Sequence, residues 1–163
     1  MARHCTVVLM ALSFVTMTDR HHELHVLGMM RELYATDAPE LRVNPEKFPA
    51  TIDRLLAEPS RGRVLLFMRD DAVAGYALLI PYWSNEFGGI VVLIDELLVE
   101  KEFRGQGIAR SFFTFIEHDR PFDAVALALE VSPKNERARA LYESMGFTER
   151  HLRMMTRTLP AAV

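Results

Sequence analysis

A long apolar run that leads into a glycine-bearing loop constrains this chain more than any other feature. Residues 90–99 are almost wholly apolar, which is typical of a buried strand, and a helix is expected over residues 105–119. The junction between them contains Arg104 and, in the first turn of the expected helix, Gly107. Backbone N–H groups at the start of a helix attract anions, and a glycine there lets a phosphate approach closely. The segment predicts either a phosphate-binding loop or an ordinary strand–turn–helix joint.

The composition indicates one domain over residues 1–163, with residues 1–5 as a disordered leader. Half of the 163 residues are hydrophobic, which is enough for a core. The formal charge of −3 argues against a nucleic-acid-binding surface. Cys5 is the only cysteine, which excludes an internal disulfide and favours a cytoplasmic location. Residues 6–17 have the outline of a signal peptide, but they lack a clean cleavage site, so we favour a first strand.

The periodicity of the remaining segments predicts a mixed α+β fold. Helices are expected over residues 19–36, 46–57, 105–119 and 135–145, and strands over 64–68, 72–82, 90–99, 124–131 and 147–158. Residues 81–89 are expected to form a loop. A hairpin-rich first half adjoins a strand–helix–strand unit in the second half, and this order predicts a mixed sheet with helices on both faces.

Two separated segments match one family. The stretch Arg104-Gly-Gln-Gly107-Ile-Ala109 fits a loop of the form (Arg/Gln)-x-x-Gly-x-(Gly/Ala). Downstream, residues 135–147 fit the form Asn-x-x-Ala…Leu-Tyr-x-x-x-Gly-Phe. In this order and spacing, the chain resembles the GNAT superfamily of N-acetyltransferases over nearly its whole length. The resemblance implies a central, mostly antiparallel mixed sheet flanked by helices on both faces, and acetyl-CoA as co-substrate.

The resemblance also implies where acetyl-CoA is held. The pyrophosphate is expected at the glycine-bearing loop, and the pantetheine arm along the end of the preceding strand, in a splay between that strand and the one at 124–131. On the last helix, Asn135, Ala138 and Tyr142 are expected to contact the cofactor, although asparagine is also a good helix cap. The other cofactor-binding residues expected are Leu97, Leu98, Val99, Arg104, Gly105, Gln106, Gly107, Ile108, Ala109 and Arg110.

Tyr142 is the expected general acid. Asn135 and Tyr142 are seven residues apart, about 700° of helical rotation, so they lie almost on one helix face. A phenol with a pKa of about 10 can donate a proton to a thiolate of similar basicity. Similar enzymes use the tyrosine at this place in that way. The alternative is a tyrosine packed under the sheet, with its hydroxyl bonded to the backbone.

Three carboxylates compete for the role of general base. Asp95 and Glu96 interrupt an otherwise apolar strand, where a carboxylate is unfavourable without a partner or a task. Side chains alternate along a strand, so only one of the two enters a given cleft unless a bulge intervenes. We favour Glu96 as the base and Asp95 as an acceptor-binding residue, and a salt bridge at the strand end is the alternative. Glu130 is the rival, because it matches the base of ribosomal-protein N-terminal acetyltransferases.

The loop at 82–89 and a group of histidines are further candidates. Trp83 and Glu86 are expected to bind an ammonium group through cation–π and charge contacts. The alternative is a loop whose aromatic residues plug the edge of the core. His21 and His25 share a helix face, but no third ligand is obvious, so we expect a solvated surface and no metal.

The sequence therefore predicts an acetyl-CoA-dependent N-acetyltransferase that acts on a small, cationic primary amine. A polyamine, an amino-acid derivative or an aminoglycoside-like compound would fit. The alternatives are acetylation of a protein N-terminus or lysine with Glu130 as base, a non-catalytic acyl-CoA-binding module, and a nucleotide-binding regulatory domain. We expect no nucleic-acid or membrane partner, and a homodimer through the last strands.

Overall fold

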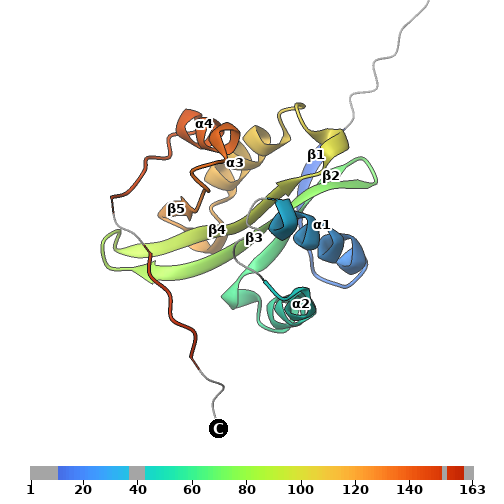
Figure 1. Ribbon diagram of the computed structural model, residues 1–163, viewed down its shortest axis with the longest axis horizontal. Coiled ribbons are helices and arrows are strands. Elements are labelled where there is room, and N and C mark those ends of the chain that lie inside the picture. Colours follow the sequence, from blue (N-terminus) through green and yellow to red (C-terminus); the bar gives the residue numbers. More distant parts are fainter. Residues whose placement is uncertain (1–10, 37–42, 152–153, 160–163) are drawn as a thin grey trace, which may run out of the picture.

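The computed structural model describes residues 11–36, 43–151 and 154–159, and in these residues five strands form one open sheet (Figure 1). The strands lie in chain order: β1 (Leu12–Thr16), β2 (Arg63–Arg69), β3 (Ala72–Ser84), β4 (Gly89–Val99) and β5 (Ala126–Leu129). Strands β1 to β4 pair antiparallel, whereas β4 and β5 are parallel. The expectation of a mixed, mostly antiparallel sheet is confirmed.

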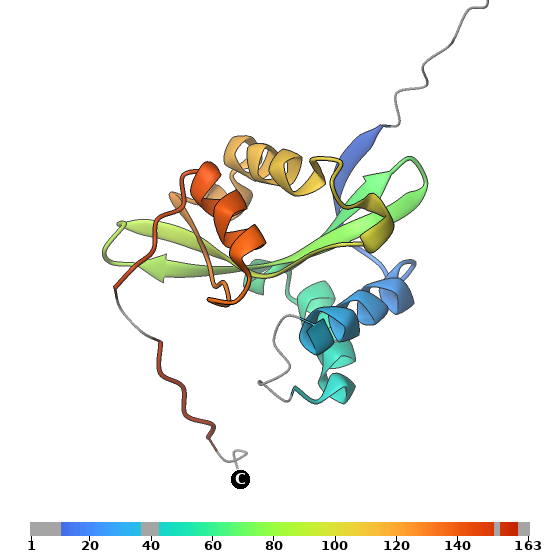
Figure 2. The same ribbon diagram turned by 45° about the horizontal axis from the view of Figure 1, so that its top comes forward.

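Helices cover both faces of the sheet, as the element order predicts (Figure 2). Helices α1 (Glu23–Thr36) and α2 (Phe48–Ala57) lie on one face, and α3 (Ile108–Asp119) and α4 (Glu136–Ser144) lie on the other. Short 3-10 turns occupy η2 (Pro45–Lys47), η3 (Pro59–Arg61), η4 (Lys101–Phe103) and η5 (Pro121–Asp123). No helix in the described ranges is long and apolar enough to cross a membrane.

The sheet separates two hydrophobic clusters, one under each pair of helices. In β2, Val64 and Leu66 pack towards α1 and α2, whereas Leu65 and Phe67 pack towards α3. Both faces of β2 are therefore buried, which explains why its sequence is continuously apolar instead of alternating. Helix α3 contributes an apolar stripe at helical spacing, formed by Ile108, Phe112, Phe113 and Ile116.

A β-bulge at Asp95 decides which way the acidic side chains of β4 point. The β3 residues opposite Ile94 and Glu96 are consecutive in sequence, so Asp95 has no opposite residue. Val92 and Ile94 pack in the cluster under α3, whereas Leu98 packs in the cluster under α1. Strict alternation would have placed all of these even-numbered side chains on one face. The bulge thus turns Glu96 towards α1.

The hairpin between β3 and β4 is longer than its sequence predicts. Residues 81–89 are expected to form a loop, but β3 continues to Ser84, and only a tight turn separates it from Gly89. Tyr82 and Trp83 pair with Val91 and Ile90 across the ladder. Aromatic and β-branched residues favour such cross-strand pairs, which outweigh the loop-like composition of this segment.

The prediction of a last strand over residues 147–158 is wrong. The described residues between 147 and 158 contain no strand. Met154 and Met155 are 73% and 94% exposed, so these two residues do not pack on a sheet. Instead, Glu149 and Arg150 make ion pairs with Arg139 and Glu86.

The chain's first elements differ from prediction only in their limits. The first helix begins at Glu23, four residues later than expected, because Asp19 accepts a hydrogen bond from His21 N at 2.8 Å in a turn that precedes it. Strand β1 begins at Leu12. The expected leader at 1–5 and the first half of the expected strand at 6–17 lie outside the described residues.

Candidate active site

Two glycines in left-handed conformation shape the loop between β4 and α3. Gly105 and Gly107 both have φ of 78°, a region that other residues rarely adopt. A Cβ built at either glycine would meet nothing within 4 Å, so the space beside the loop is open. Gly107 is the N-cap of α3 and makes no side-chain capping bond, which leaves the first N–H groups of the helix available to an anion. Arg104 Nε donates to Val99 O at 2.7 Å and fastens the loop to β4.

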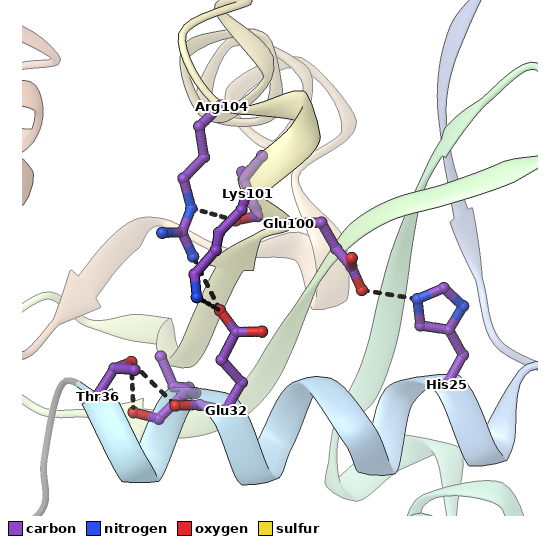
Figure 3. A network of polar contacts seen from close by, with 8 residues as sticks. His25, Glu32, Thr36, Glu100, Lys101 and Arg104 are labelled. Carbon is purple, nitrogen blue, oxygen red and sulfur yellow. Dashed lines mark hydrogen bonds and ion pairs between the residues drawn. The ribbon is translucent and has the colours of Figure 1, made fainter.

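Charged side chains tie this loop to helix α1 (Figure 3). Arg104 Nη2 lies 3.4 Å from Glu32 Oε1, and Lys101 Nζ lies 3.9 Å from the same oxygen. Closer to the start of α1, His25 Nε2 lies 2.7 Å from Glu100 Oε1. The basic residues beside the loop are therefore partly neutralised by a helix on the far side of the sheet from α3.

The remaining loop residues have structural partners. Gln106 Oε1 accepts a hydrogen bond from Arg69 Nη2 at 3.1 Å. Arg110 points towards α4, where its Nη2 donates to Ser144 Oγ at 2.8 Å. Ile108 is buried and Ala109 is partly buried, so these two residues anchor the inner face of α3.

Strands β4 and β5 separate beyond Ile94. Their pairing runs from Val91 with Ala126 to Ile94 with Leu129, and among the described residues no strand continues on that side of residues 95–99. The outward backbone groups of this part of β4 can pair with an extended ligand, as a sheet edge does with an added strand. Leu97, Leu98 and Val99 all lie along this opening.

Glu96 is buried and holds both of its oxygens in hydrogen bonds. Only 6% of the residue is exposed. Tyr34 donates to its Oε1 at 2.8 Å, and Tyr76 donates to its Oε2 at 2.7 Å. Burial raises the pKa of Glu96, the two phenol bonds oppose that rise, and Asp95 adds to it. Burial also raises the pKa of both tyrosines, so both remain protonated donors.

Asp95 and Glu130 meet where β4 and β5 separate. Each directly follows the last residue pair of the parallel ladder, Ile94 with Leu129. Asp95 keeps much of its surface exposed, yet the surrounding protein desolvates its carboxylate and raises its pKa, and Glu130 raises this pKa further. The structure therefore brings Asp95, Glu96 and Glu130 to one region of the sheet.

Tyr142 lies on the other face of the sheet from Glu96. It is partly buried on α4, and its ring lies 5.6 Å from the Phe113 ring and 6.1 Å from the Phe147 ring, both edge-on. Asn135 is the N-cap of α4, because its Oδ1 accepts from Ala138 N at 3.1 Å. The capping role considered for Asn135 is thus present, and cofactor contact by Asn135 and Ala138 stays a prediction.

Trp83 and Glu86 lie at the far end of β4 from Glu96. Trp83 is opposite Ile90, six residues before Glu96, which corresponds to about 20 Å along a strand. Glu86 is held by Arg150, whose Nη2 lies 2.8 Å and 2.7 Å from the two carboxylate oxygens. The structure does not bring Trp83 and Glu86 beside the acidic cluster formed by Asp95, Glu96 and Glu130.

No sequence pattern points to the two tyrosines that hold Glu96. Tyr34 belongs to the apolar stripe of a helix and Tyr76 to an apolar strand, so both read as ordinary packing residues. The bond between Tyr34 and Glu96 joins residues 62 positions apart, which no local pattern reveals. Within the described ranges, no three His, Cys, Asp or Glu side chains gather into a metal-ligand group.

Comparisons with known proteins identify the family. A family model described as "Acetyltransferase (GNAT) family" matches residues 27–147. A "possible acetyltransferase" from Clostridium difficile 630 has a similar structure, with a TM-score of 0.78 at 20% identity over 92% of this chain and 99% of that chain. An aminoglycoside N-acetyltransferase in complex with CoA is also similar in structure, with a TM-score of 0.73 at 18% identity over 91% of this chain and 95% of that chain.

A ribosomal-protein-alanine N-acetyltransferase from Brucella melitensis biovar Abortus 2308 gives a TM-score of 0.70 at 17% identity over 91% of this chain and 100% of that chain. At these identities the likeness establishes the fold alone. A comparison with curated proteins finds no match. The family match covers most of the chain and includes the glycine-bearing loop, the acidic cluster and Tyr142. This chain belongs to the GNAT family of N-acetyltransferases.

Proposed function

We propose that this protein transfers the acetyl group of acetyl-CoA to the primary amine of a small cationic acceptor by direct attack. The observation that carries the proposal is a buried carboxylate, Glu96, beside the stretch of β4 that lacks a neighbour on the β5 side. A base at this position can take the proton of an amine next to a thioester bound along β4. A cytoplasmic location and a homodimer stay predictions from the sequence.

Acetyl-CoA fits the residues around the β4–α3 loop. Its diphosphate suits the uncapped N–H groups after Gly107 and the cations Lys101 and Arg104. Its extended pantetheine arm suits the outward backbone groups of residues 95–99. Among the structural neighbours, an aminoglycoside N-acetyltransferase is bound to a bisubstrate analogue of CoA and acetylneamine.

The proposed chemistry divides between the two faces of the sheet. Glu96 is the final acceptor of the amine proton on the α1 side, and Tyr142 donates a proton to the departing thiolate on the α4 side. The thioester is already activated, so most of the rate enhancement comes from positioning. Proton transfer by each side chain adds about 100-fold or more.

The carboxylates at the β4–β5 opening favour a cationic acceptor. Asp95 and Glu130 lie together at the surface end of this opening, and a bound ammonium would relieve their mutual repulsion. We assign Asp95 to acceptor binding. We leave Trp83 and Glu86 outside the acceptor site, because they lie at the other end of the hairpin.

A second candidate function is acetylation of a protein N-terminus with Glu130 as base. It is favoured by the exposure of Glu130 at the end of β5, and a ribosomal-protein-alanine N-acetyltransferase is among the structural neighbours. An exposed carboxylate at the opening is accessible to a peptide amine, whereas Glu96 is enclosed.

The proposal is tested by a thiol-release assay with acetyl-CoA and three amines: spermidine, neamine and a peptide with N-terminal alanine. We expect turnover of spermidine or neamine that falls about 100-fold or more in Glu96→Gln and little in Glu130→Gln. Turnover of the peptide alone, with the reverse order of the two variants, would support the second function instead.

Binding of the donor is measured separately by thermal unfolding with acetyl-CoA, CoA, ATP and NAD. A ligand at about 100 times its dissociation constant adds about 2.7 kcal/mol to the stability of the folded state. Stabilisation by both CoA species, but not by ATP or NAD, is expected. Stabilisation without turnover of any amine would favour a non-catalytic acyl-CoA-binding module.

A further inference from the structure

The base that the proposed function needs is enclosed. Both oxygens of Glu96 accept hydrogen bonds from phenols, Oε1 from Tyr34 at 2.8 Å and Oε2 from Tyr76 at 2.7 Å. With 6% of the residue exposed, Glu96 offers no open path to an amine nitrogen. A proton that leaves the acceptor must therefore pass through a group that already contacts Glu96.

The two phenols differ in their access to the surface. Tyr76 lies in β3 and is 0% exposed, enclosed in the cluster under α1. Tyr34 lies near the end of α1 and is partly exposed. Its ring is stacked on Phe48, with centroids 5.4 Å apart and an interplanar angle of 23°, which fixes the direction of its hydroxyl. Of the three hydrogen-bonded groups, Tyr34 is the one open to a substrate.

We propose that Tyr34 is a catalytic residue that relays the proton of the acceptor ammonium to Glu96, and this proposal rests on the proposed function with Glu96 as base. An N–H bond of the ammonium breaks and its proton joins the Tyr34 oxygen, while the Tyr34 O–H bond breaks and its proton joins Glu96 Oε1. The nitrogen keeps its electron pair for attack on the thioester. The phenol is regenerated, and Glu96 changes from carboxylate to carboxylic acid.

The surrounding charges suit a relay that ends at Glu96. The titratable groups that act on Glu96 are Tyr34 from α1, Tyr76 from β3 and Asp95 from β4, and Glu130 after β5 acts on Asp95. Burial and Glu96 both raise the pKa of Tyr34, so this phenol stays protonated and passes a proton on instead of keeping a charge. The raised pKa of Glu96 makes it the better final acceptor of the proton.

Two matched variants test the relay. Tyr34→Phe and Tyr76→Phe each remove one hydrogen bond to the same carboxylate, and each keeps the aromatic ring. Both changes raise the pKa of Glu96, because the lost bond favours its ionised form, so the acidic limb of kcat/KM moves to higher pH in both. On the plateau above that limb, Tyr34→Phe is expected to stay about 100-fold below the wild type, and the loss in Tyr76→Phe is expected to be about tenfold smaller than that.

The assay uses whichever of spermidine, neamine and the alanine peptide is turned over fastest, with Glu96→Gln in the same series. A wild-type plateau in Tyr34→Phe, or an equal plateau loss in both phenylalanine variants, overturns the relay and leaves the base intact. A wild-type plateau in Glu96→Gln overturns the base, and no turnover of any amine overturns the proposed function. Either of these last two outcomes also overturns the relay, because the relay needs both Glu96 as base and an acetylated amine.

A second measurement does not depend on the folding of Tyr76→Phe. Rates in mixtures of H2O and D2O report how many protons move together in the rate-limiting step. A curved dependence is expected for the wild type, where two protons move, and a linear one for Tyr34→Phe, provided that its unfolding temperature and acetyl-CoA affinity match the wild type. Identical linear dependences in both proteins would contradict the relay.

Discussion

Glu96 is an acid whose neighbours act on its pKa in opposite directions. Burial raises this pKa most, the bonds from Tyr76 and Tyr34 lower it, and Asp95 raises it again, with a net rise. A carboxylate with an ordinary pKa is a weak base at neutral pH, so the rise suits the proposed proton transfer. The same rise ties the stability of the fold to pH.

A pKa above the unfolded value means that folded Glu96 binds its proton more tightly than the unfolded chain does. Its contribution to stability is fully present below the unfolded pKa, about 4.3, and is lost as pH rises through the higher native pKa. Glu96→Gln removes this loss, so the free energy of unfolding should decline less between about pH 4.5 and about pH 8 than in the wild type. Urea unfolding at both pH values measures this. Glu117→Gln, at an exposed carboxylate, is the control, and an unchanged decline in Glu96→Gln would contradict the prediction.

Tyr142→Phe should lower kcat by about 100-fold or more, because it removes the proposed proton donor to the thiolate. The edge-on ring contacts with Phe113 and Phe147 are kept, so acetyl-CoA affinity should change little. Thiol release and calorimetric titration measure the two quantities. Tyr82→Phe, at an exposed tyrosine of the β3–β4 hairpin, should behave as the wild type. Full activity in Tyr142→Phe would exclude the acid role.

Strand β4 and the loop after it form the element that organises the site. The bulge at Asp95 turns Glu96 towards α1, and the end of pairing with β5 at Ile94 leaves the next residues open. Gly75 on β3 lets the two strands approach closely here, because a Cβ at that position would lie 2.3 Å from Leu98 O. Bulges commonly change the direction of side chains next to active sites. The bulge at Asp95 separates the proposed base, Glu96, from the Asp95 and Glu130 carboxylates at the surface.

Gly107→Ala tests the loop at the start of α3. Its φ of 78° makes any side chain unfavourable, so stability should fall by about 1–2 kcal/mol. Acetyl-CoA affinity should fall about tenfold or more, since one hydrogen bond to a charged group contributes about 1.5–3 kcal/mol. Gly88→Ala is the matched control, because Gly88 has φ of 63° and equally open surroundings in the β3–β4 turn. Equal affinity losses in both variants would mean that the loop binds no phosphate.

Across the whole molecule, helices on both faces of the sheet contribute side chains to the proposed site at the opening between β4 and β5. Helix α1 supplies Tyr34 to Glu96 and also Glu32 to the cations of the β4–α3 loop, whereas α4 supplies Tyr142 from the other face. One helix therefore connects the proposed proton path with the proposed diphosphate site. The ion pairs of Glu32 with Arg104 and Lys101 would compete with the proposed binding of a diphosphate by these two cations.

Glu32→Gln should strengthen acetyl-CoA binding by about twofold to fivefold at low ionic strength, because partly exposed ion pairs contribute about 0.2–1 kcal/mol. The gain should shrink as salt screens the freed cations. Titration calorimetry at two salt concentrations measures both effects. Glu58→Gln is the control, since it removes comparable ion pairs to Arg54 and Arg61 that lie away from the loop. A weaker affinity in Glu32→Gln would show that the ion pairs instead hold the loop in its binding shape.

Helices and strands that depend on interactions between residues close in sequence can be predicted from the sequence. The apolar run at 90–99 is a strand, and the stripe at Phe112 and Ile116 is the buried face of a helix. The last helix is capped by Asn135 and is followed, after its C-cap, by Gly146 with φ of 87°. Periodicity, capping and left-handed glycine act within a few residues, so one sequence suffices to read them. The family motifs are equally local.

Which distant residues meet depends on how remote segments pack against one another. The bulge that reverses the alternation of β4, and the placement of Trp83 far from Glu96, depend on the register between neighbouring strands. A shift of one residue in that register exchanges the two faces of a strand. The sequence of β4 by itself does not predict this register. The bond from Tyr34 to Glu96 depends in addition on how α1 packs against the sheet. The residues that surround the proposed base are therefore a property of packing between remote segments, where the sequence predicts only that a carboxylate is present.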